Sequence, residues 1–290
     1  MERQSRLALF FCIGTTKTGS TLLANVLDRH PKIACIVEAK AFEPDNPSSM
    51  LNPQSSKWRR HGFSEEAVRL LARQWSSTPM TLVQVLRRIT KRSWSFAYMP
   101  AKALHFRCVM SSIFADFASR CYVNIVGDKT PGYIGNIQAL VRAFPDAKFI
   151  YGMRDPRAVY DWAYRYGGDN DDKRADHALN QLLWSNKAIS PYLARPNFTT
   201  VRYEDLVCES QETLRHLYEF LGCDFSIEYL HYNRQLDPYP DRWYWNPNAC
   251  DPIDPYHATE WKKQMSSTNI QRVSKLADWF IEKYGYSDSV

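Results

Sequence analysis

The feature that most constrains the fold is an apolar run that leads through a glycine-bounded loop into a helix. Residues Ala8–Ile13 are apolar, and Gly14–Gly19 follow as a loop. A helix is expected over Ser20–Arg29; it ends at His30-Pro31, because a proline disfavours helical backbone in the residue before it. The backbone amides of such a loop, together with the positive end of the helix dipole, form a cradle for an anion.

Strand-like and helical segments alternate along the rest of the chain. Further strands are expected at Ile33–Val37, Tyr122–Gly127, Lys148–Met153 and Phe198–Arg202. Helices are expected at Glu65–Trp75, Met80–Arg92, Ile134–Ala143, Ala175–Leu193, Gln211–Leu221 and Ile270–Tyr284. This alternation predicts an α/β fold in which helices flank a central parallel sheet, with the phosphate-binding loop after the first strand.

We expect a single domain over residues 1–290, because this length suits one well-buried core and no linker is visible. The helices of residues 60–120 form an insertion in that domain. Residues 45–63 are expected to be a loop. The proline- and aromatic-rich residues 237–257 form a second loop, which is a candidate lid.

Composition narrows the class of partner. Hydrophobic residues make up 44% of the chain and charged residues 23%, which is an ordinary globular balance. The net charge of +6 comes without a run of five Lys or Arg, so nucleic acid is not expected as a partner. A modest positive excess suits a small polyanion.

The seven cysteines and the first residues bear on location. The cysteines are odd in number and include no C-x-x-C pair, which favours a reducing compartment such as the cytoplasm. The apolar run Leu7–Ile13 is too short to span a membrane and has no cleavage site. No membrane association is expected.

The loop resembles a Walker A phosphate loop in spacing but differs from it in its lysine. Gly14 and Gly19 stand as in G-x-x-x-x-G-K-[ST], yet Ser20 occupies the lysine position, and Lys17 lies within the loop. A magnesium-dependent nucleotide kinase or nucleotide-binding protein is therefore the alternative interpretation. A simple strand-to-helix turn that contains glycines is a second one.

Four motifs in order carry a family resemblance that spans nearly the whole chain. They are Thr16-Lys17-Thr18-Gly19-Ser20-Thr21, Met153-Arg154-Asp155-Pro156-Arg157, Val201-Arg202-Tyr203-Glu204-Asp205-Leu206 and Glu260-Trp261-Lys262-Lys263. In this order they resemble the sulfotransferases that use 3′-phosphoadenosine 5′-phosphosulfate (PAPS). Leu22-Leu23 and Asp28-Arg29-His30-Pro31 are similar to the bacterial, heparan and tyrosyl branches of that superfamily.

The resemblance implies a cofactor site and a reaction. It implies that PAPS, and its product 3′,5′-bisphosphate PAP, bind to Thr16, Lys17, Thr18, Gly19, Ser20, Thr21, Arg154, Tyr203, Lys262 and Lys263. The chain departs from the family at two of its positions. Leu22 replaces a tryptophan that stacks on adenine, and Trp162 replaces a serine that helps to hold the 3′-phosphate.

Catalytic candidates follow from the expected strand ends and from the resemblance. Glu38 directly follows Ile33–Val37, and Lys129 follows the strand Tyr122–Gly127, so both are expected at the carboxyl edge beside the loop. Glu38 is the expected general base, and Lys17 and Lys129 are expected to stabilise the sulfuryl oxygens. His105 is the second candidate base. A solvated carboxylate at Glu38 and a surface pair of Lys129 with Asp128 are the structural alternatives.

The acceptor is expected to be a small molecule with a hydroxyl or amine, and peptide tyrosine or glycan are alternatives. Trp243, Tyr244 and Trp245 are candidate substrate contacts. Aspartates are grouped in two loops, at Asp169, Asp171 and Asp172 and at Asp237, Asp241, Asp251 and Asp254. If they flank the acceptor pocket, the acceptor is cationic; if they cap helices and turns, they have no such role. No metal-binding motif is present in the sequence, and in-line transfer from a good leaving group requires none.

Overall fold

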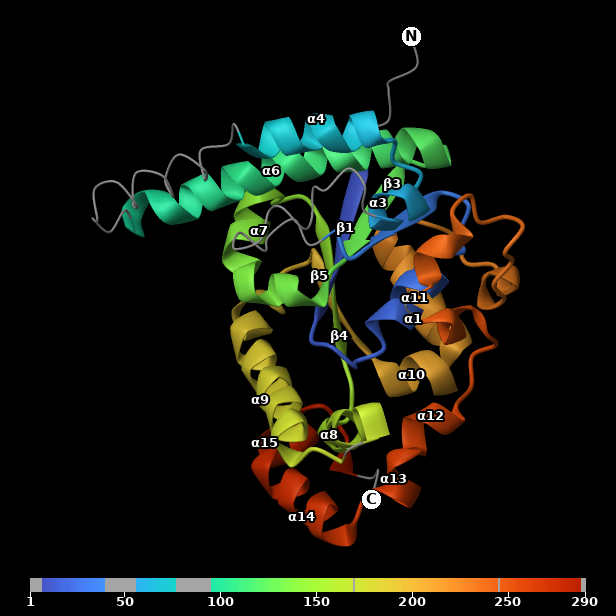
Figure 1. The fold of residues 1–290 in the computed structure, drawn as a ribbon. Coiled ribbons are helices and arrows are strands. Elements are labelled where there is room, and N and C mark those ends of the chain that lie inside the picture. The colour runs from blue at the N-terminus through green and yellow to red at the C-terminus, as the bar shows by residue number, and fades with distance from the viewer. Residues whose placement is uncertain (1–6, 40–55, 77–94, 169, 245, 288–290) are drawn as a thin grey trace.

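The centre of the molecule is a parallel sheet of five strands in the order β2-β3-β1-β4-β5 (Figure 1). The computed structural model describes residues 7–39, 56–76, 95–168, 170–244 and 246–287. The strands are β1 (Ala8–Gly14), β2 (Ile33–Val37), β3 (Ile125–Lys129), β4 (Lys148–Met153) and β5 (Phe198–Arg202). The predicted parallel sheet flanked by helices is confirmed.

Side chains of β1 alternate between two hydrophobic cores because successive residues of a strand point to opposite faces. Phe11 and Ile13 pack in one core and Phe10 and Cys12 in the other. The first core is covered by α6 (Ser95–Cys121), α7 (Ile137–Ala143), α8 (Pro156–Arg165) and α9 (Asp172–Ile189). The second is covered by α1 (Ser20–Asp28) and α11 (Ser210–Leu221), which lie across the sheet from α7 and α9 (Figure 1). Both faces of the sheet are thus buried, as continuous apolar strands require.

Between β2 and β3 the chain forms helices that pack beside the sheet. α3 (Ser56–Arg60) lies within the predicted loop 45–63, whose residues up to 55 lie outside the described ranges. α4 (Glu65–Ser76) matches its prediction and lies along α6 (Figure 1). The predicted helix Met80–Arg92 also lies outside the described residues.

The third strand begins and ends later than predicted. Tyr122, the first residue of the predicted strand, is 94% exposed and has a φ of 56°, so it belongs to the turn after α6. Asp128 and Lys129 are polar, yet both are buried at the end of β3. The polar residues Asp128 and Lys129 predict a strand end at Gly127. In the structure, backbone pairing of β3 with β1 and β2 continues through Lys129.

The remaining helices cover the carboxyl edge and one end of the sheet. They are α10 (Tyr203–Cys208), α12 (Tyr256–Thr259), α13 (Trp261–Gln264), α14 (Ser267–Leu276) and α15 (Asp278–Lys283). Short 3-10 turns occur at Pro131–Asn136, Tyr166–Gly168, Ser190–Tyr192, Ile227–Leu230, Pro240–Trp243 and Pro247–Cys250. The predicted helix Ile270–Tyr284 is divided in two at Ala277, whose backbone leaves the helical region. Across the described residues, no helix combines the length and apolarity needed to cross a membrane.

Candidate active site

The carboxyl ends of all five strands bring predicted site residues to one edge of the sheet. The loop Thr15–Gly19 follows β1, and Glu38 follows β2. Lys129 ends β3, Arg154 follows β4, and Tyr203 follows β5. Parallel strands end at a common edge, and ligands of open α/β sheets bind there. These positions were therefore predictable from local sequence once the strands were recognised.

The loop has the backbone of an anion cradle. Lys17 has a φ of 74° and Gly19 a φ of 75°, both in the left-handed region. Gly19 caps α1 without a side-chain hydrogen bond, so the amides of the first helical turn have no partner within the helix. A Cβ at Gly19 would lie 2.2 Å from Cδ2 of Tyr203, which only glycine avoids. The loop thus leads into the N-terminal end of α1 at a site where Tyr203 contacts it directly.

Lys129 and Glu38 form an ion pair beside this loop. Lys129 Nζ lies 2.9 Å from Glu38 Oε1 and 3.3 Å from Thr21 Oγ1. The Lys129 side chain is 2% exposed and that of Glu38 is 35% exposed. The Glu38 N–H donates to the carbonyl of Lys129 at 2.8 Å, and the φ of Glu38 is 57°. The pair is held by the sheet itself, with the carboxylate on its accessible side.

Lys17 extends from the loop onto an aromatic pair of α8 and the turn after it. Its Nζ lies 3.5 Å from the ring centroid of Trp162 and 5.0 Å from that of Tyr166. The two rings stack with centroids 4.6 Å apart. Burial lowers the pKa of Lys17, with Glu38 raising it and Lys129 lowering it further. At the position where the family resemblance leads one to expect a serine, an aromatic face therefore holds the loop lysine.

Arg154 connects the loop with the segment near α12 and α13. Its guanidinium lies 4.2 Å from the ring of Tyr203 and donates to the carbonyls of Lys17 at 3.4 Å and His257 at 2.7 Å. Its Nε is buried without a partner, as is Oγ1 of Thr15 in the loop. Buried polar atoms nearly always have partners, so two such donors at one edge suit a polar ligand.

The predicted basic pair lies on α13, close to this segment in the chain. Lys262 and Lys263 are exposed, and Lys263 Nζ lies 5.2 Å from the ring of Tyr256 on α12. Because His257 of α12 accepts a hydrogen bond from Arg154, the structure joins α12 to the strand edge. Lys262 and Lys263 are exposed to solvent on α13, the helix that follows α12.

The predicted acceptor contacts have different surroundings. Trp243 is 2% exposed in the core, and its indole N–H donates to Asp237 at 2.8 Å, so it presents no face to an acceptor. Tyr244 is 38% exposed, and the guanidinium of Arg60 lies 3.2 Å from its ring centroid. Trp245 lies outside the described residues. The expectation that Trp243 contacts the acceptor is therefore corrected: the side chain is buried, which the local aromatic pattern could not show.

His105, the second candidate base, falls on α6, and its side chain is outside the described part of the chain. The helix packs against α4 and α7 and against β2 and β3. Its role as a base remains a prediction.

Most of the aspartates in the two acidic loops have structural partners. Asp171 caps α9 by accepting two backbone N–H bonds, and Asp254 accepts one at 2.9 Å. Asp172 accepts from a tyrosine hydroxyl at 2.6 Å. Asp237 and Asp241 pair with arginines at 2.9 and 2.8 Å. These contacts match the alternative in which the aspartates cap and pair, and they do not support an acidic acceptor pocket.

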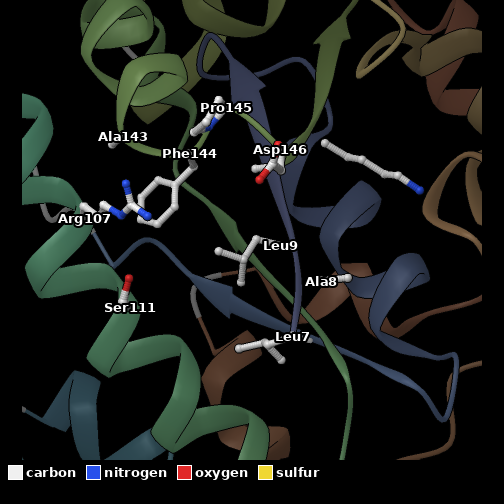
Figure 2. Close-up of a pocket in the computed structure, with 11 residues that line it drawn as sticks. Leu7, Ala8, Leu9, Arg107, Ser111, Ala143, Phe144, Pro145 and Asp146 are labelled. Carbon is white, nitrogen blue, oxygen red and sulfur yellow. The ribbon is translucent and has the colours of Figure 1, made fainter. Parts of the chain in front are cut away.

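A cavity of about 350 Å³ lies at the opposite edge of the sheet, by the amino ends of β1 and β4 (Figure 2). Leu7, Leu9, Phe144 and Pro145 form apolar walls, and Arg107 of α6 stands at one side. The predicted catalytic and cofactor residues are absent from its lining. The reactive groups gather at the other edge, which is the candidate site.

Comparison with known proteins identifies the family. The sequence model of the protein family described as "Sulfotransferase family" matches residues 10–226. This chain belongs to the sulfotransferase family. The predicted family is thus confirmed, and the match includes the loop, Glu38, Lys129, Arg154 and Tyr203.

Two curated relatives and one solved structure are similar to this sulfotransferase. Nodulation protein NoeE of Sinorhizobium fredii is 24% identical over 97% of the chain, which spans 66% of that protein. Omega-hydroxy-beta-dihydromenaquinone-9 sulfotransferase Stf3 of Mycobacterium tuberculosis is 32% identical over 32% of the chain and 28% of its own length. The sulfotransferase domain of the Synechococcus PCC 7002 olefin synthase has a TM-score of 0.54 at 20% identity, covering 96% of this chain and 97% of that domain. The last likeness shows the shared fold.

Sequence reasoning missed several groups of this sulfotransferase that shape the site. The stacked pair Trp162 and Tyr166 lies on α8 and the turn after it, a helix that was not predicted. Its start was signalled by Asp155 and Pro156, since aspartate favours the N-cap and proline the first helical position. The four-residue spacing of the two aromatic residues then places both rings on one side.

Proposed function

We propose that this sulfotransferase moves a sulfuryl group from PAPS to a hydroxyl or amine of a small-molecule acceptor, by in-line displacement. The observation that carries the proposal is the contact of Lys129 Nζ with Glu38 Oε1 at 2.9 Å, beside the loop that holds Lys17. A carboxylate and two ammonium groups at one strand edge supply both a proton acceptor and positive charge.

The groups present fit an adenosine phosphosulfate. The loop leads into the start of α1, whose first amides have no partner within the helix and suit a phosphate or sulfate group. Arg154 supplies a guanidinium with a buried, unpartnered Nε, which suits a second phosphate. The ring of Tyr203, packed under that guanidinium, is an aromatic surface on which the adenine of PAPS would stack. Lys262 and Lys263 would add positive charge from α13.

When bound, PAPS would supply an activated sulfuryl group with a bisphosphate as leaving group. Glu38 would take the proton of the attacking hydroxyl or amine, since its carboxylate is the accessible member of the pair. Lys129 would hold that carboxylate in place and, with Lys17, offer positive charge to developing negative oxygens. Both lysines are positioned by the sheet and the loop before any ligand arrives.

An alcohol is a reasonable class of acceptor within this proposal. The name of Stf3 describes a hydroxylated menaquinone as the acceptor of that relative, and the similarity to it covers 32% of this chain and 28% of Stf3. Peptide tyrosine and glycan are the alternative acceptors. A nucleotide kinase is not favoured, because Ser20 stands where a Walker loop carries lysine.

Nucleotide choice tests the proposal. PAP at about a hundred times its dissociation constant should stabilise the protein by about 2.7 kcal/mol, and ATP with magnesium should not. Thermal unfolding with each nucleotide measures this stabilisation.

Arg154→Ala should reduce the rise in melting temperature that PAP causes. Arg195→Ala, which changes an exposed arginine before β5, should leave that rise intact. Equal stabilisation by ATP with magnesium would end the sulfotransferase proposal.

A further inference from the structure

The residues that follow α15 insert a tyrosine beneath the Arg154 side of the site. The chain turns at Gly285, which has a φ of 68°, and Tyr286 is completely buried. The Tyr286 N–H donates to the carbonyl of Ile281 at 2.9 Å. Its ring lies parallel to that of Phe280 with centroids 6.1 Å apart, and the guanidinium of Arg202 lies 4.4 Å from it. This side chain is therefore fixed on several sides.

Tyr286 contacts two groups that belong to the motif after β4 and the motif after β5. Its carbonyl accepts from Arg157 Nη2 at 2.7 Å, and its hydroxyl donates to Glu204 Oε2 at 3.2 Å. The other oxygen of Glu204, Oε1, accepts from the N–H of Asp155 at 2.9 Å. One tyrosine thus joins both motifs through the Glu204 carboxylate.

The Asp155 amide belongs to the peptide that follows Arg154. Glu204 therefore holds the backbone of Arg154, and it directly follows Tyr203, whose ring packs under the Arg154 guanidinium. Asp155 also caps α8 by accepting from the Arg157 N–H at 2.8 Å, and it pairs with the Arg157 side chain at 2.7 Å. Both members of that pair are 1% exposed, so this end of the network is closed to water.

From these contacts we infer that Tyr286 is a positioning residue for the phosphate site of Arg154. It orients Glu204 and Arg157, and through them it sets the backbone of Arg154 and the ring of Tyr203. The inference rests on the proposed function, because it concerns the PAP phosphate that Arg154 would bind. If the hydroxyl is removed, the Glu204 carboxylate loses this donor at Oε2 and is held less firmly against the Asp155 amide.

The test compares two tyrosines of the same segment and two nucleotides. Tyr286→Phe removes the bond to Glu204 and keeps the buried ring. Tyr284→Phe is the matched control, since its hydroxyl accepts from Asn186 Nδ2 at 2.6 Å, away from the Arg154 motif. Calorimetric titration measures the affinity of each protein for PAP and for adenosine 5′-monophosphate, which lacks the 3′-phosphate.

Tyr286→Phe should weaken PAP binding about three- to tenfold and leave adenosine 5′-monophosphate binding unchanged, because the loss is expected only where Arg154 meets a phosphate. Tyr284→Phe should bind both as the parent does. Glu204→Ala should also weaken PAP, since it removes both acceptor oxygens, and this variant keeps the test valid if Tyr286→Phe does not fold.

Three results would overturn the role: unchanged PAP affinity in Tyr286→Phe and Glu204→Ala, an equal loss for both nucleotides, or the same loss in Tyr284→Phe. A parent protein that binds no PAP would instead overturn the proposed function, and the role of Tyr286 with it. The titration of the parent separates these two failures.

Discussion

Glu38 combines a strained backbone with an accessible carboxylate. Its φ of 57° is uncommon for a residue other than glycine, and its side chain is 35% exposed while its partner Lys129 is 2% exposed. Such strain is often found where a side chain must be aimed at a site. Both features are what a base aimed at an acceptor requires.

Glu38→Gln tests that role. The amide keeps the shape but takes no proton, so transfer to a hydroxyl should fall by roughly 10²–10⁴ while PAP affinity survives. Steady-state rates and a PAP titration of the same preparation measure the two effects. An almost unchanged rate would remove Glu38 as the base and leave His105 as the candidate.

The contact of Lys17 with Trp162 predicts how PAP affinity depends on pH. Burial is the largest cause of the lowered pKa of Lys17, so its charge should be lost at a lower pH than that of an ordinary lysine. PAP affinity should therefore decline on the alkaline side, at a pH below the ordinary lysine pKa of 10.5. Trp162→Leu should expose Lys17, raise its pKa and move the decline to higher pH.

Titration of PAP at a series of alkaline pH values measures this decline in affinity. Lys17→Met should lack the decline. Trp184→Leu, which changes an exposed tryptophan on α9, is the control for loss of a tryptophan. A decline at the same pH in Trp162→Leu as in the parent would show that the ring does not set the pKa of Lys17.

At the scale of elements, the junction of β1, the loop and α1 depends on one glycine. Gly19→Ala would place a Cβ at 2.2 Å from the ring of Tyr203, in a backbone conformation with a φ of 75°. The protein should lose about 1–3 kcal/mol of stability and bind PAP far more weakly, because either the loop or Tyr203 must move.

Urea unfolding and a PAP titration check this prediction. Gly132→Ala is the matched control, since a Cβ there meets nothing within 4 Å. If Gly19→Ala bound PAP as tightly as the control does, the close approach of Tyr203 to the loop would be unimportant for the site.

At the scale of the whole molecule, a buried arginine ties the segment before Trp243 to the sheet. Arg242 pairs with Asp28 at the end of α1 and with Asp237, the latter at 2.9 Å. Asp28 also accepts from the N–H of Cys35 on β2 at 2.6 Å. This anchor holds the start of the candidate lid, residues 237–257, in the folded core.

Burial raises the pKa of Asp28 to about 7; Asp237 adds to the rise, while Arg242 opposes it. The folded protein then holds a proton that the unfolded chain releases near its ordinary pKa of 3.8. Between these values the folded state binds more protons, so the free energy of unfolding should fall as pH rises, by up to about 1.4 kcal/mol per pH unit.

Asp28→Asn should remove this contribution, and Asp116→Asn, an exposed aspartate on α6, should keep it. Urea unfolding at several values from about pH 5 to 8 gives the slopes. Parallel slopes for Asp28→Asn and the parent would show that Asp28 does not carry the proton.

Much of the site could be predicted because its positions follow from local patterns. β4 and β5 have the predicted bounds, and Arg154 and Tyr203 come directly after them. In a parallel sheet, the residue that follows a strand reaches the same edge as the others, whatever the order of the strands. Glu38 reached its expected place by this rule, and so did Lys129, although its strand was set too early.

The sequence by itself determined the fold class, the family and the positions around the loop, because strand ends and glycine-bounded turns depend on near neighbours in the chain. Only the tertiary structure decided that Lys17 lies on Trp162, that Trp243 is buried, and that Tyr286 supports Glu204. Each of the first and last contacts joins residues far apart in the chain, and burial of Trp243 depends on elements of both the first and second halves. Such contacts depend on how whole elements pack, which no local pattern specifies.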